Sequence, residues 1–334
     1  MAQSYECKHA MRNFLKALVL AHIALAVYIL FCFSDIIGLL IQNWHTNIFT
    51  SEELDPDREG LISTDSLLIP RIIHQTYKNT NLPEAWKKGQ EACIKLNPDY
   101  KYVLWTDEKA RNFIAKNYPW FLTTWDGYKF PIERADAIRY FVLYHYGGVY
   151  IDLDDFCKRR LDPLLTAPAF VTESEPVGIS NDVMGSVPHH PFLEKMLRSL
   201  QEHDRNLILP YATILFSTGP VFASILYEKY FRSPGSKIED IKMLLSKNCN
   251  GKDHSFFKMT RGSSWHRGDA KYILAIGRHI PLTVFISTLF VLSIFFLEWC
   301  LYSMYTCKDF FRPFRILTDK LKLRRKVLKR SLSD

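Results

Sequence analysis

Two long apolar runs divide this chain, and they limit what it can fold into more than any other feature. The first run covers 17–41, and its first half is interrupted only by His22; the second covers 280–304 and carries no charge before Glu298. Each run is long enough to cross the hydrocarbon core of a bilayer as a helix. The pattern therefore predicts two transmembrane helices with one folded domain between them.

Each run also has an alternative interpretation. The first could be a cleaved signal peptide, but it is long for an apolar signal region and lacks a cleavage site of small residues. The second could be a helix of a protein core, but aromatic residues at its end and basic residues after it are typical of a membrane span.

The net charge of +8 is concentrated at the two ends of the chain. Residues 308–334 contain ten Lys or Arg and three Asp, whereas 1–16 contain three Lys or Arg and one Glu, so the rest of the chain is close to neutral. Basic flanks favour the cytosolic side of a membrane, which predicts a cytosolic N-terminus (1–16), a cytosolic tail (305–334) and a lumenal domain. The tail could also lie on anionic headgroups. A nucleic-acid partner is not expected, because the domain itself is not basic.

The region between the spans begins with a polar, acidic stem at 42–66 and continues as a domain at 67–278. Strand-like and helix-like segments alternate through its first half, which favours an α/β domain with a largely parallel sheet. We expect strands at 67–77, 100–105, 149–153 and 168–174, and helices at 83–97, 106–118 and 132–146 and from 191 and 219. Three cysteines fall in the domain, so it can form at most one disulfide.

Three aspartates end the apolar segment "GGVYIDLDDF", where unpaired charge is costly. Alternate residues of a strand point to the same side, so Asp152 and Asp154 should converge. Two adjacent carboxylates need a counter-ion, and Mn²⁺ or Mg²⁺ sharing diphosphate oxygens fits this requirement. The Asp-x-Asp pattern alone is weak, because exposed acidic turns also match it; its place at the end of a strand strengthens it.

The segment "ERADAIRYF" places Asp136 and Arg139 three residues apart on one helix. Such pairs are usually surface salt bridges of little energetic weight. This helix, however, leads through Gly147 and Gly148 directly into the aspartate strand, so both motifs can border one cleft. Arg139 would then neutralise phosphate, and Asp136 would accept hydrogen bonds from sugar hydroxyls.

The segments "IPRIIHQTYK", "ERADAIRYFVLYHYGGVYIDLD", "SNDVMGSVPHHPF", "STGP" and "GSSWH" occur in the order seen in glycosyltransferase family 32, which the chain resembles over 69–266. The resemblance implies the GT-A fold of nucleotide-diphospho-sugar transferases. A domain between two spans is most similar to the fungal mannosyl-inositol-phosphorylceramide synthase catalytic subunits. The Golgi glycoprotein mannosyltransferases of the same family typically carry only the N-terminal anchor.

The resemblance also implies roles for individual residues. Asp152 and Asp154 match the metal-binding pair, with His266 as a candidate third ligand, and Asp136 and Arg139 match the pair that holds the donor sugar. Residues implied in donor binding are His74, Gln75, Tyr77, Arg134, Ser264 and Trp265, and Asp182 is a candidate catalytic carboxylate. Tyr77 stands where relatives usually have Trp. His266 could instead be a hydrogen-bonded loop residue, Trp265 a core anchor and Asp182 part of an Asx turn.

The implied reaction is metal-dependent transfer of mannose from GDP-mannose to inositol phosphorylceramide, with retention of the anomeric configuration. No carboxylate pair suited to double displacement is evident, so a front-face reaction is expected. The resemblance further implies residence in the Golgi or endoplasmic reticulum membrane and a multi-spanning, calcium-binding regulatory partner. The alternatives are a Golgi glycoprotein mannosyltransferase and a catalytically silent regulatory subunit; the intact acidic motifs argue against the silent subunit.

Overall fold

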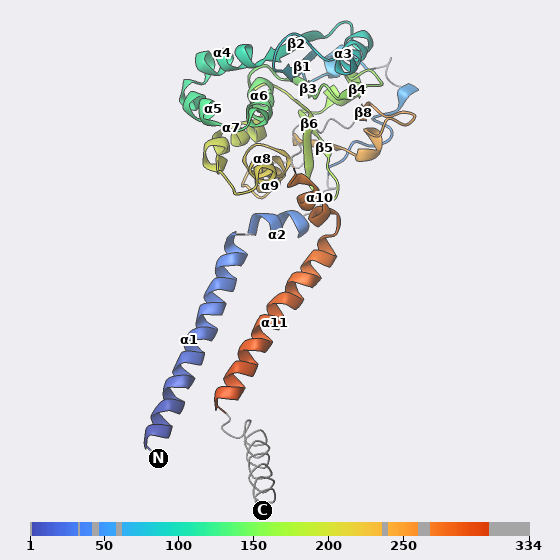
Figure 1. The fold of residues 1–334 in the computed structure, drawn as a ribbon. Helices are drawn as coiled ribbons and strands as arrows, with labels where there is room; N and C mark the ends of the chain where they lie inside the picture. Colours follow the sequence, from blue (N-terminus) through green and yellow to red (C-terminus); the bar gives the residue numbers. More distant parts are fainter. Residues whose placement is uncertain are drawn as a thin grey trace, which may run out of the picture. The chain divides into compact units, whose positions relative to one another are not determined.

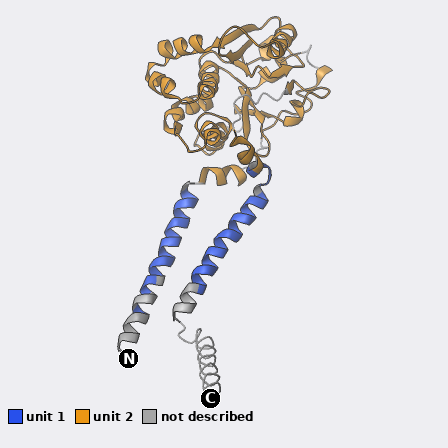
Figure 2. Ribbon diagram, in the orientation of Figure 1, with its two compact units in different colours: residues 1–31, 276–334 blue, residues 32–275 orange. Residues whose placement is uncertain are grey.

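The computed structural model describes residues 2–32, 34–41, 47–57, 62–235, 240–259 and 268–306. The chain divides into two compact units, Cys32–Ala275 and the combination of Met1–Phe31 with Ile276–Asp334 (Figure 2).

The larger unit is built on a mixed six-stranded sheet in the order β2-β1-β3-β6-β5-β7, with a separate two-stranded sheet of β4 and β8 (Figure 1). The strands are β1 (Ile72–Tyr77), β2 (Lys101–Thr106), β3 (Gly148–Ile151), β4 (Asp155–Cys157), β5 (Ala169–Glu173), β6 (Ile179–Ser186), β7 (Lys242–Leu244) and β8 (Phe257–Met259). The predicted α/β class is confirmed.

The sheet is less parallel than the sequence predicts. The pairs β1–β2, β1–β3 and β5–β7 are parallel, but β6 is antiparallel to both β3 and β5. The physical reason is the short connection between β5 and β6: a few residues can reverse the chain, whereas a parallel return needs a crossover of a dozen or more.

Helices cover both faces of the sheet. The α-helices of the larger unit are α2 (Ser34–Ile41), α3 (Glu84–Leu96), α4 (Asp107–Asn117), α5 (Leu122–Gly127), α6 (Pro131–Tyr146), α7 (Pro191–His203), α8 (Pro210–Ser217), α9 (Pro220–Phe231) and α10 (Ala270–Arg278). Short 3₁₀ turns are η2 (Thr64–Ser66), η3 (Pro119–Phe121), η4 (Asp162–Thr166) and η6 (Ser246–Asn248). Thr106 caps α4, because its side chain accepts a hydrogen bond from the Lys109 N–H at 3.2 Å.

Two buried clusters occupy the two faces of the sheet, as the strand period of two requires. Tyr150 of β3 faces the cluster formed with α4, α6, α7 and α9, whereas Val149 and Ile151 face the cluster that contains Cys93 and Cys157. A disulfide joins Cys93 of α3 to Cys157 of β4. Helix α3 is thereby attached to the segment that directly follows the aspartate motif.

The smaller unit contains most of α1 (Ala2–Cys32) and α11 (Ile280–Thr306). Within α11, Pro281–Cys300 is long and apolar enough to cross a membrane. In the predicted first span, Lys16–Phe31 is long and apolar enough to cross a membrane only when it is taken together with Ser34–Ile41, which forms the separate helix α2. His22 Nε2 of α1 lies 3.3 Å from Glu298 Oε1 of α11, so the polar interruptions of the two apolar runs contact each other.

Candidate active site

A pocket of about 420 Å³ opens at the carboxyl ends of β1, β2 and β3. Ligands bind at this edge in open α/β sheets. Four residues that the sequence singled out line it: Tyr77, Arg139, Asp152 and Asp154. The other lining residues are Thr76, Lys78, Trp86, Asp107, Phe130, Pro131, Ile132, Ala135, Leu153 and Ile214.

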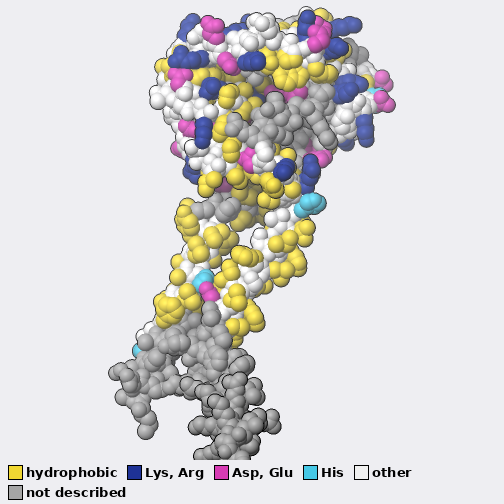
Figure 3. Space-filling view, viewed as in Figure 1, with side chains coloured by type: hydrophobic (Ala, Val, Ile, Leu, Met, Phe, Trp, Pro, Cys, Tyr) yellow, Lys and Arg dark blue, Asp and Glu magenta, His cyan; other side chains and the backbone are white. Residues whose placement is uncertain are grey.

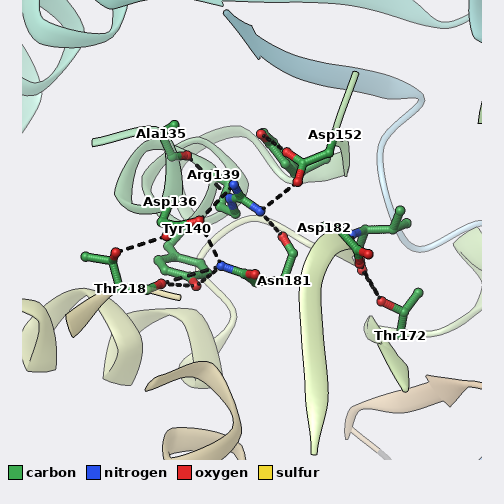
Figure 4. Close-up of polar contacts among 11 residues, drawn as sticks. Ala135, Asp136, Arg139, Tyr140, Asp152, Thr172, Asn181, Asp182 and Thr218 are labelled. Carbon is green, nitrogen blue, oxygen red and sulfur yellow. Dashed lines mark hydrogen bonds and ion pairs between the residues drawn. The ribbon is translucent and has the colours of Figure 1, made fainter. Parts of the chain in front are cut away.

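Arg139 is the centre of a buried polar network beneath this pocket (Figure 4). Its guanidinium lies 2.9 Å from Asp136 Oδ1 and 3.3 Å from Asp152 Oδ2, and it also donates to the carbonyl oxygens of Ala135 and Asn181. The exposed fraction of the side chain is 3% for Arg139 and 6% for Asp136. The pair is therefore not a surface salt bridge, and its ionic contacts act in a region of low dielectric.

Asp136 lies behind Arg139 and does not line the pocket. Its carboxylate accepts hydrogen bonds from Thr218 Oγ1 at 3.0 Å and from Asn181 Nδ2 at 3.1 Å. Burial raises the pKa of Asp136 to about 6, and the Arg139 charge opposes that rise. Asp136 is thus fixed by three partners and orients Arg139 toward the pocket.

Asp152 and Asp154 reach the pocket through a turn rather than by strand alternation. Strand β3 ends at Ile151, and the Asp155 N–H donates to the Asp152 carbonyl oxygen at 3.0 Å. The expectation that the two aspartates share one side of an extended strand is therefore wrong, because the backbone turns before Asp154. The Tyr150 hydroxyl donates to Asp152 Oδ1 at 2.7 Å and holds that carboxylate in place.

The aspartate turn rests on α3. A Cβ at Gly89 would lie 2.3 Å from the ring of Phe156 and 3.1 Å from the Leu153 carbonyl oxygen, so only glycine allows this approach. Together with the Cys93–Cys157 disulfide, this contact attaches the aspartate turn to α3.

The two aspartates fit a divalent cation. Burial and the Asp152 charge raise the pKa of Asp154 to about 6, which means that a nearby positive charge would relieve repulsion between the two carboxylates. Among the residues that the structure describes, no group of three His, Cys, Asp or Glu side chains forms a metal cage. Mg²⁺ is commonly held by one or two carboxylates that share it with substrate phosphates, and this donor set matches that pattern.

Asp182 lies next to the network but does not line the pocket. Its Oδ1 accepts hydrogen bonds from Thr172 Oγ1 at 3.0 Å and from the Val183 N–H at 2.7 Å. Burial raises its pKa, and the Asp152 charge adds to the rise. Its backbone carbonyl accepts the Asp152 N–H at 2.9 Å, so Asp182 also positions the start of the aspartate turn.

Other residues implied in donor binding are placed away from the pocket lining. His74 is buried: Trp105 Nε1 donates to its Nδ1 at 3.0 Å, and its Nε2 lies 2.9 Å from the Gly147 carbonyl oxygen. Burial lowers the pKa of His74 to about 4, so the ring is neutral and makes both contacts. Gln75 accepts a hydrogen bond from the Tyr102 hydroxyl.

Arg134 donates to the Tyr128 carbonyl oxygen at 3.0 Å and does not line the pocket. Ser264, Trp265 and His266 lie outside the residues that the structure describes. Their predicted contacts with the donor and the cation stay predictions.

Sequence reasoning missed Trp86, Lys78 and Asp107, which line the pocket beside Tyr77. Trp86 meets the Tyr77 ring edge-on, with ring centroids 5.4 Å apart. The register that pairs Tyr77 with Thr106 places Asp107 at the same edge of the sheet. The available sequence signal was the position of Asp107 just after the predicted strand at 100–105. Trp86 gave none, because it begins a helix whose packing depends on the fold.

Comparison with known proteins agrees with this site. Residues 83–171 match the family described as a glycosyltransferase sugar-binding region containing the DXD motif. The chain is 47% identical to mannosyl phosphorylinositol ceramide synthase SUR1 of Saccharomyces cerevisiae over 300 residues, which cover 90% of this chain and 78% of that protein. It is 51% identical to inositol phosphoceramide mannosyltransferase 2 of Schizosaccharomyces pombe over 243 residues, covering 71% of this chain and 70% of that protein.

Solved structures give a weaker likeness. The PaToxG glycosyltransferase aligns with 20% identity and a TM-score of 0.34, covering 48% of this chain and 70% of that one. A glycosyltransferase involved in glycosylation of the PBCV-1 major capsid aligns with 14% identity and a TM-score of 0.26, covering 52% and 79%. These scores are too low to support an argument.

Proposed function

Because this chain belongs to glycosyltransferase family 32, whose sugar-binding region carries the DXD motif, we propose that it transfers mannose from GDP-mannose to inositol phosphorylceramide. One observation carries the proposal: Arg139 is buried between Asp136 and Asp152 and lines a pocket of about 420 Å³. That network is intact in a chain whose relatives are named as a mannosyl phosphorylinositol ceramide synthase and an inositol phosphoceramide mannosyltransferase. A silent subunit would have no need of it.

The part of the pocket lined by Tyr77, Trp86 and Asp107 suits a guanine base. Tyr77 and Trp86 offer aromatic faces, and Asp107 lies beside them. Guanine presents two adjacent N–H donors on one edge, which a carboxylate accepts in parallel, whereas uracil presents one donor between two acceptors. Asp107 therefore favours a guanosine donor over a uridine donor.

The diphosphate would lie over the aspartate turn. A divalent cation on Asp152 and Asp154 would supply Lewis-acid stabilisation of the departing diphosphate. Arg139 holds Asp152 in place and places a second positive charge on the pocket wall, where negative charge develops as the sugar–phosphate bond breaks. His74 and Gln75 belong to the first strand, and their hydrogen bonds with Trp105 and Tyr102 join it to β2.

We propose that the anomeric configuration is retained. Asp152 is engaged by Arg139 and Tyr150, and Asp182, which does not line the pocket, is engaged by Thr172 and Val183. The other two carboxylates of the pocket, Asp154 and Asp107, have the cation and the base as their proposed partners. No carboxylate is left as an obvious nucleophile in the part of the chain that the structure describes. A front-face reaction, in which the acceptor hydroxyl enters on the side of the departing phosphate, does not require one.

The acceptor is proposed to be a lipid in the Golgi or endoplasmic reticulum membrane, with both termini cytosolic and the domain in a GT-A arrangement on the lumenal side. The apolar Pro281–Cys300 segment supports a membrane anchor, and the contact between His22 and Glu298 supports a second span packed on it. Polar residues within spans pair with one another because unpaired ones are expensive there. A multi-spanning regulatory subunit is a further proposal that the resemblance supports.

Acceptor choice tests this function directly. The purified full chain in detergent, given GDP-mannose and Mn²⁺, should convert inositol phosphorylceramide and leave a high-mannose glycan unchanged. NMR of the product should show an α-mannoside. Transfer to the glycan but not to the lipid would instead identify a glycoprotein mannosyltransferase.

A further inference from the structure

Three consecutive aliphatic side chains project into solvent from the segment before α8. The exposed fraction is 38% for Leu207, 100% for Ile208 and 46% for Leu209. We call residues 207–209 the apolar loop. Single exposed aliphatic residues are normal on a protein surface, whereas contiguous ones mark an interaction site.

The backbone holds the apolar loop in this position. The Leu207 N–H donates to Thr213 Oγ1 at 3.0 Å, and the same hydroxyl lies 3.1 Å from the Leu209 carbonyl oxygen. Ser217 Oγ donates to the Arg205 carbonyl oxygen at 3.4 Å. Because these contacts attach the loop to α8, its side chains are exposed in the folded protein.

The neighbouring helix α10 extends the apolar surface. Its Ile273 and Leu274 pack against the cluster that contains Tyr211 and Leu215 of α8, whereas Tyr272 is 64% exposed. Asp269 accepts the Tyr211 N–H at 2.8 Å and fixes the start of α10 beside α8.

Helix α2 adds a second exposed apolar face. It packs on α9, which in turn packs on α8, and it presents Ile37, Leu40 and Ile41 to solvent. Within the larger unit, α2 and α10 lie at the end farthest from α3 (Figure 1), where hydrophobic side chains gather on the surface (Figure 3).

The occupant of this surface follows from chain continuity. Helix α10 ends at Arg278, and the apolar Pro281–Cys300 segment begins three residues later. Helix α2 continues the apolar run of α1. Two of the elements with exposed apolar faces, α2 and α10, are thus joined by the sequence to the membrane helices, and the apolar loop leads into α8, which Asp269 fixes beside α10. Three exposed basic residues adjoin this surface and suit anionic headgroups: Lys129, which donates to Asn206, Arg205 just before the apolar loop, and Lys271 of α10.

We infer that the apolar loop, with the exposed faces of α2 and α10, docks into the headgroup boundary of the bilayer that anchors the chain. This inference rests on the proposed membrane-bound function. Helix α8 begins at Pro210 and lines the donor pocket with Ile214, about 6 Å further along its axis. A lipid headgroup at the apolar loop therefore lies next to the sugar donor, and the docked surface delivers the acceptor.

Photo-crosslinking tests the docking without any need for activity. The full chain is reconstituted in nanodiscs of phosphatidylcholine and phosphatidylserine with p-benzoylphenylalanine in place of Ile208, and adducts are identified by mass spectrometry. The matched control has the same replacement at Ile94 of α3, which is 39% exposed. Lipid adducts at position 208 and none at 94 are expected. Equal labelling at both positions, no lipid adduct at 208, or an adduct to another protein there would overturn the inference.

Kinetics test the consequence for the acceptor. Ile208→Glu should raise the KM for inositol phosphorylceramide in bilayers roughly tenfold, because it removes buried apolar area. Hydrolysis of the sugar donor by the same variant should stay at the wild-type rate, and Ile94→Glu should change neither quantity. An unchanged KM in Ile208→Glu would contradict acceptor delivery. If the wild type transfers no mannose at all, the proposed function fails, while the crosslinking result still decides the docking.

Discussion

Replacing Arg139 should be among the most destabilising single changes in the domain. Arg139→Met keeps much of the side-chain volume but leaves Asp136 and Asp152 without their ionic partner at 2.9 and 3.3 Å. Breaking a buried ion pair by removing one partner costs about 3–5 kcal/mol. For a domain of this size, each kcal/mol lowers the thermal midpoint by about 2–4 °C, so we expect a decrease of about 6–20 °C.

The assay is thermal unfolding of the full chain in detergent, followed by tryptophan fluorescence. The matched control is Arg111→Met, because Arg111 makes an ion pair of similar geometry with Asp126, at 2.7–2.8 Å, but both side chains are exposed. Exposed pairs contribute little, so this control should unfold close to the wild type.

A double variant tests the cause of the loss. Asp136→Asn/Arg139→Met removes one of the two carboxylates that the single change leaves unpaired, so its midpoint should lie between those of Arg139→Met and the wild type. A thermal midpoint of Arg139→Met equal to that of Arg111→Met, or a double variant less stable than the single one, would contradict this prediction.

Three further predictions concern the pocket and its support. Cys93→Ser/Cys157→Ser opens a disulfide that closes 64 residues of chain, and the loss of about 4 kcal/mol should lower the thermal midpoint by about 8–16 °C; an unchanged midpoint under non-reducing conditions would contradict it. Because the pKa of Asp154 is raised to about 6, transfer should fall as the pH drops through about 6, where the protonated carboxyl loses the cation. A pH–rate profile should show this limb moving to lower pH at higher Mn²⁺, and a fixed limb would argue against a metal at Asp154. Asp107→Asn should raise the KM for GDP-mannose about 10- to 100-fold, by leaving a base N–H unpaired, with little change in kcat; an unchanged KM would remove Asp107 from base recognition.

Local signals in the sequence were enough for the elements that carry the site. The Thr106 cap, the long apolar pattern ending at Gly147 and the short buried strand after it each follow from neighbouring residues. Gly147 adopts a φ of 65°, a conformation that glycine tolerates best, and so ends α6 where the sequence predicted. The pairing of Asp136 with Arg139 followed from helix periodicity alone.

Long-range packing decided what the sequence could not show. Strand β6 carries the polar residues Asn181 and Asp182, which bond to the Arg139 network and to Thr172. These polar residues interrupt its apolar pattern, so the sequence indicates a strand there only weakly. Whether Arg139 is exposed depends on β6 and α8 packing around it. Histidine is a common residue type in binding sites, yet the ring of His74 is buried and accepts a hydrogen bond from Trp105 of the neighbouring strand.

We propose that the aspartate turn binds the donor for transfer to a lipid. The most direct test is mass spectrometry of the lipid product from the full chain, given GDP-mannose, inositol phosphorylceramide and Mn²⁺, beside an Asp152→Asn/Asp154→Asn variant. We expect mannosylated lipid from the wild type, none from the variant, and none from the wild type after chelation. Equal product from the variant would contradict it.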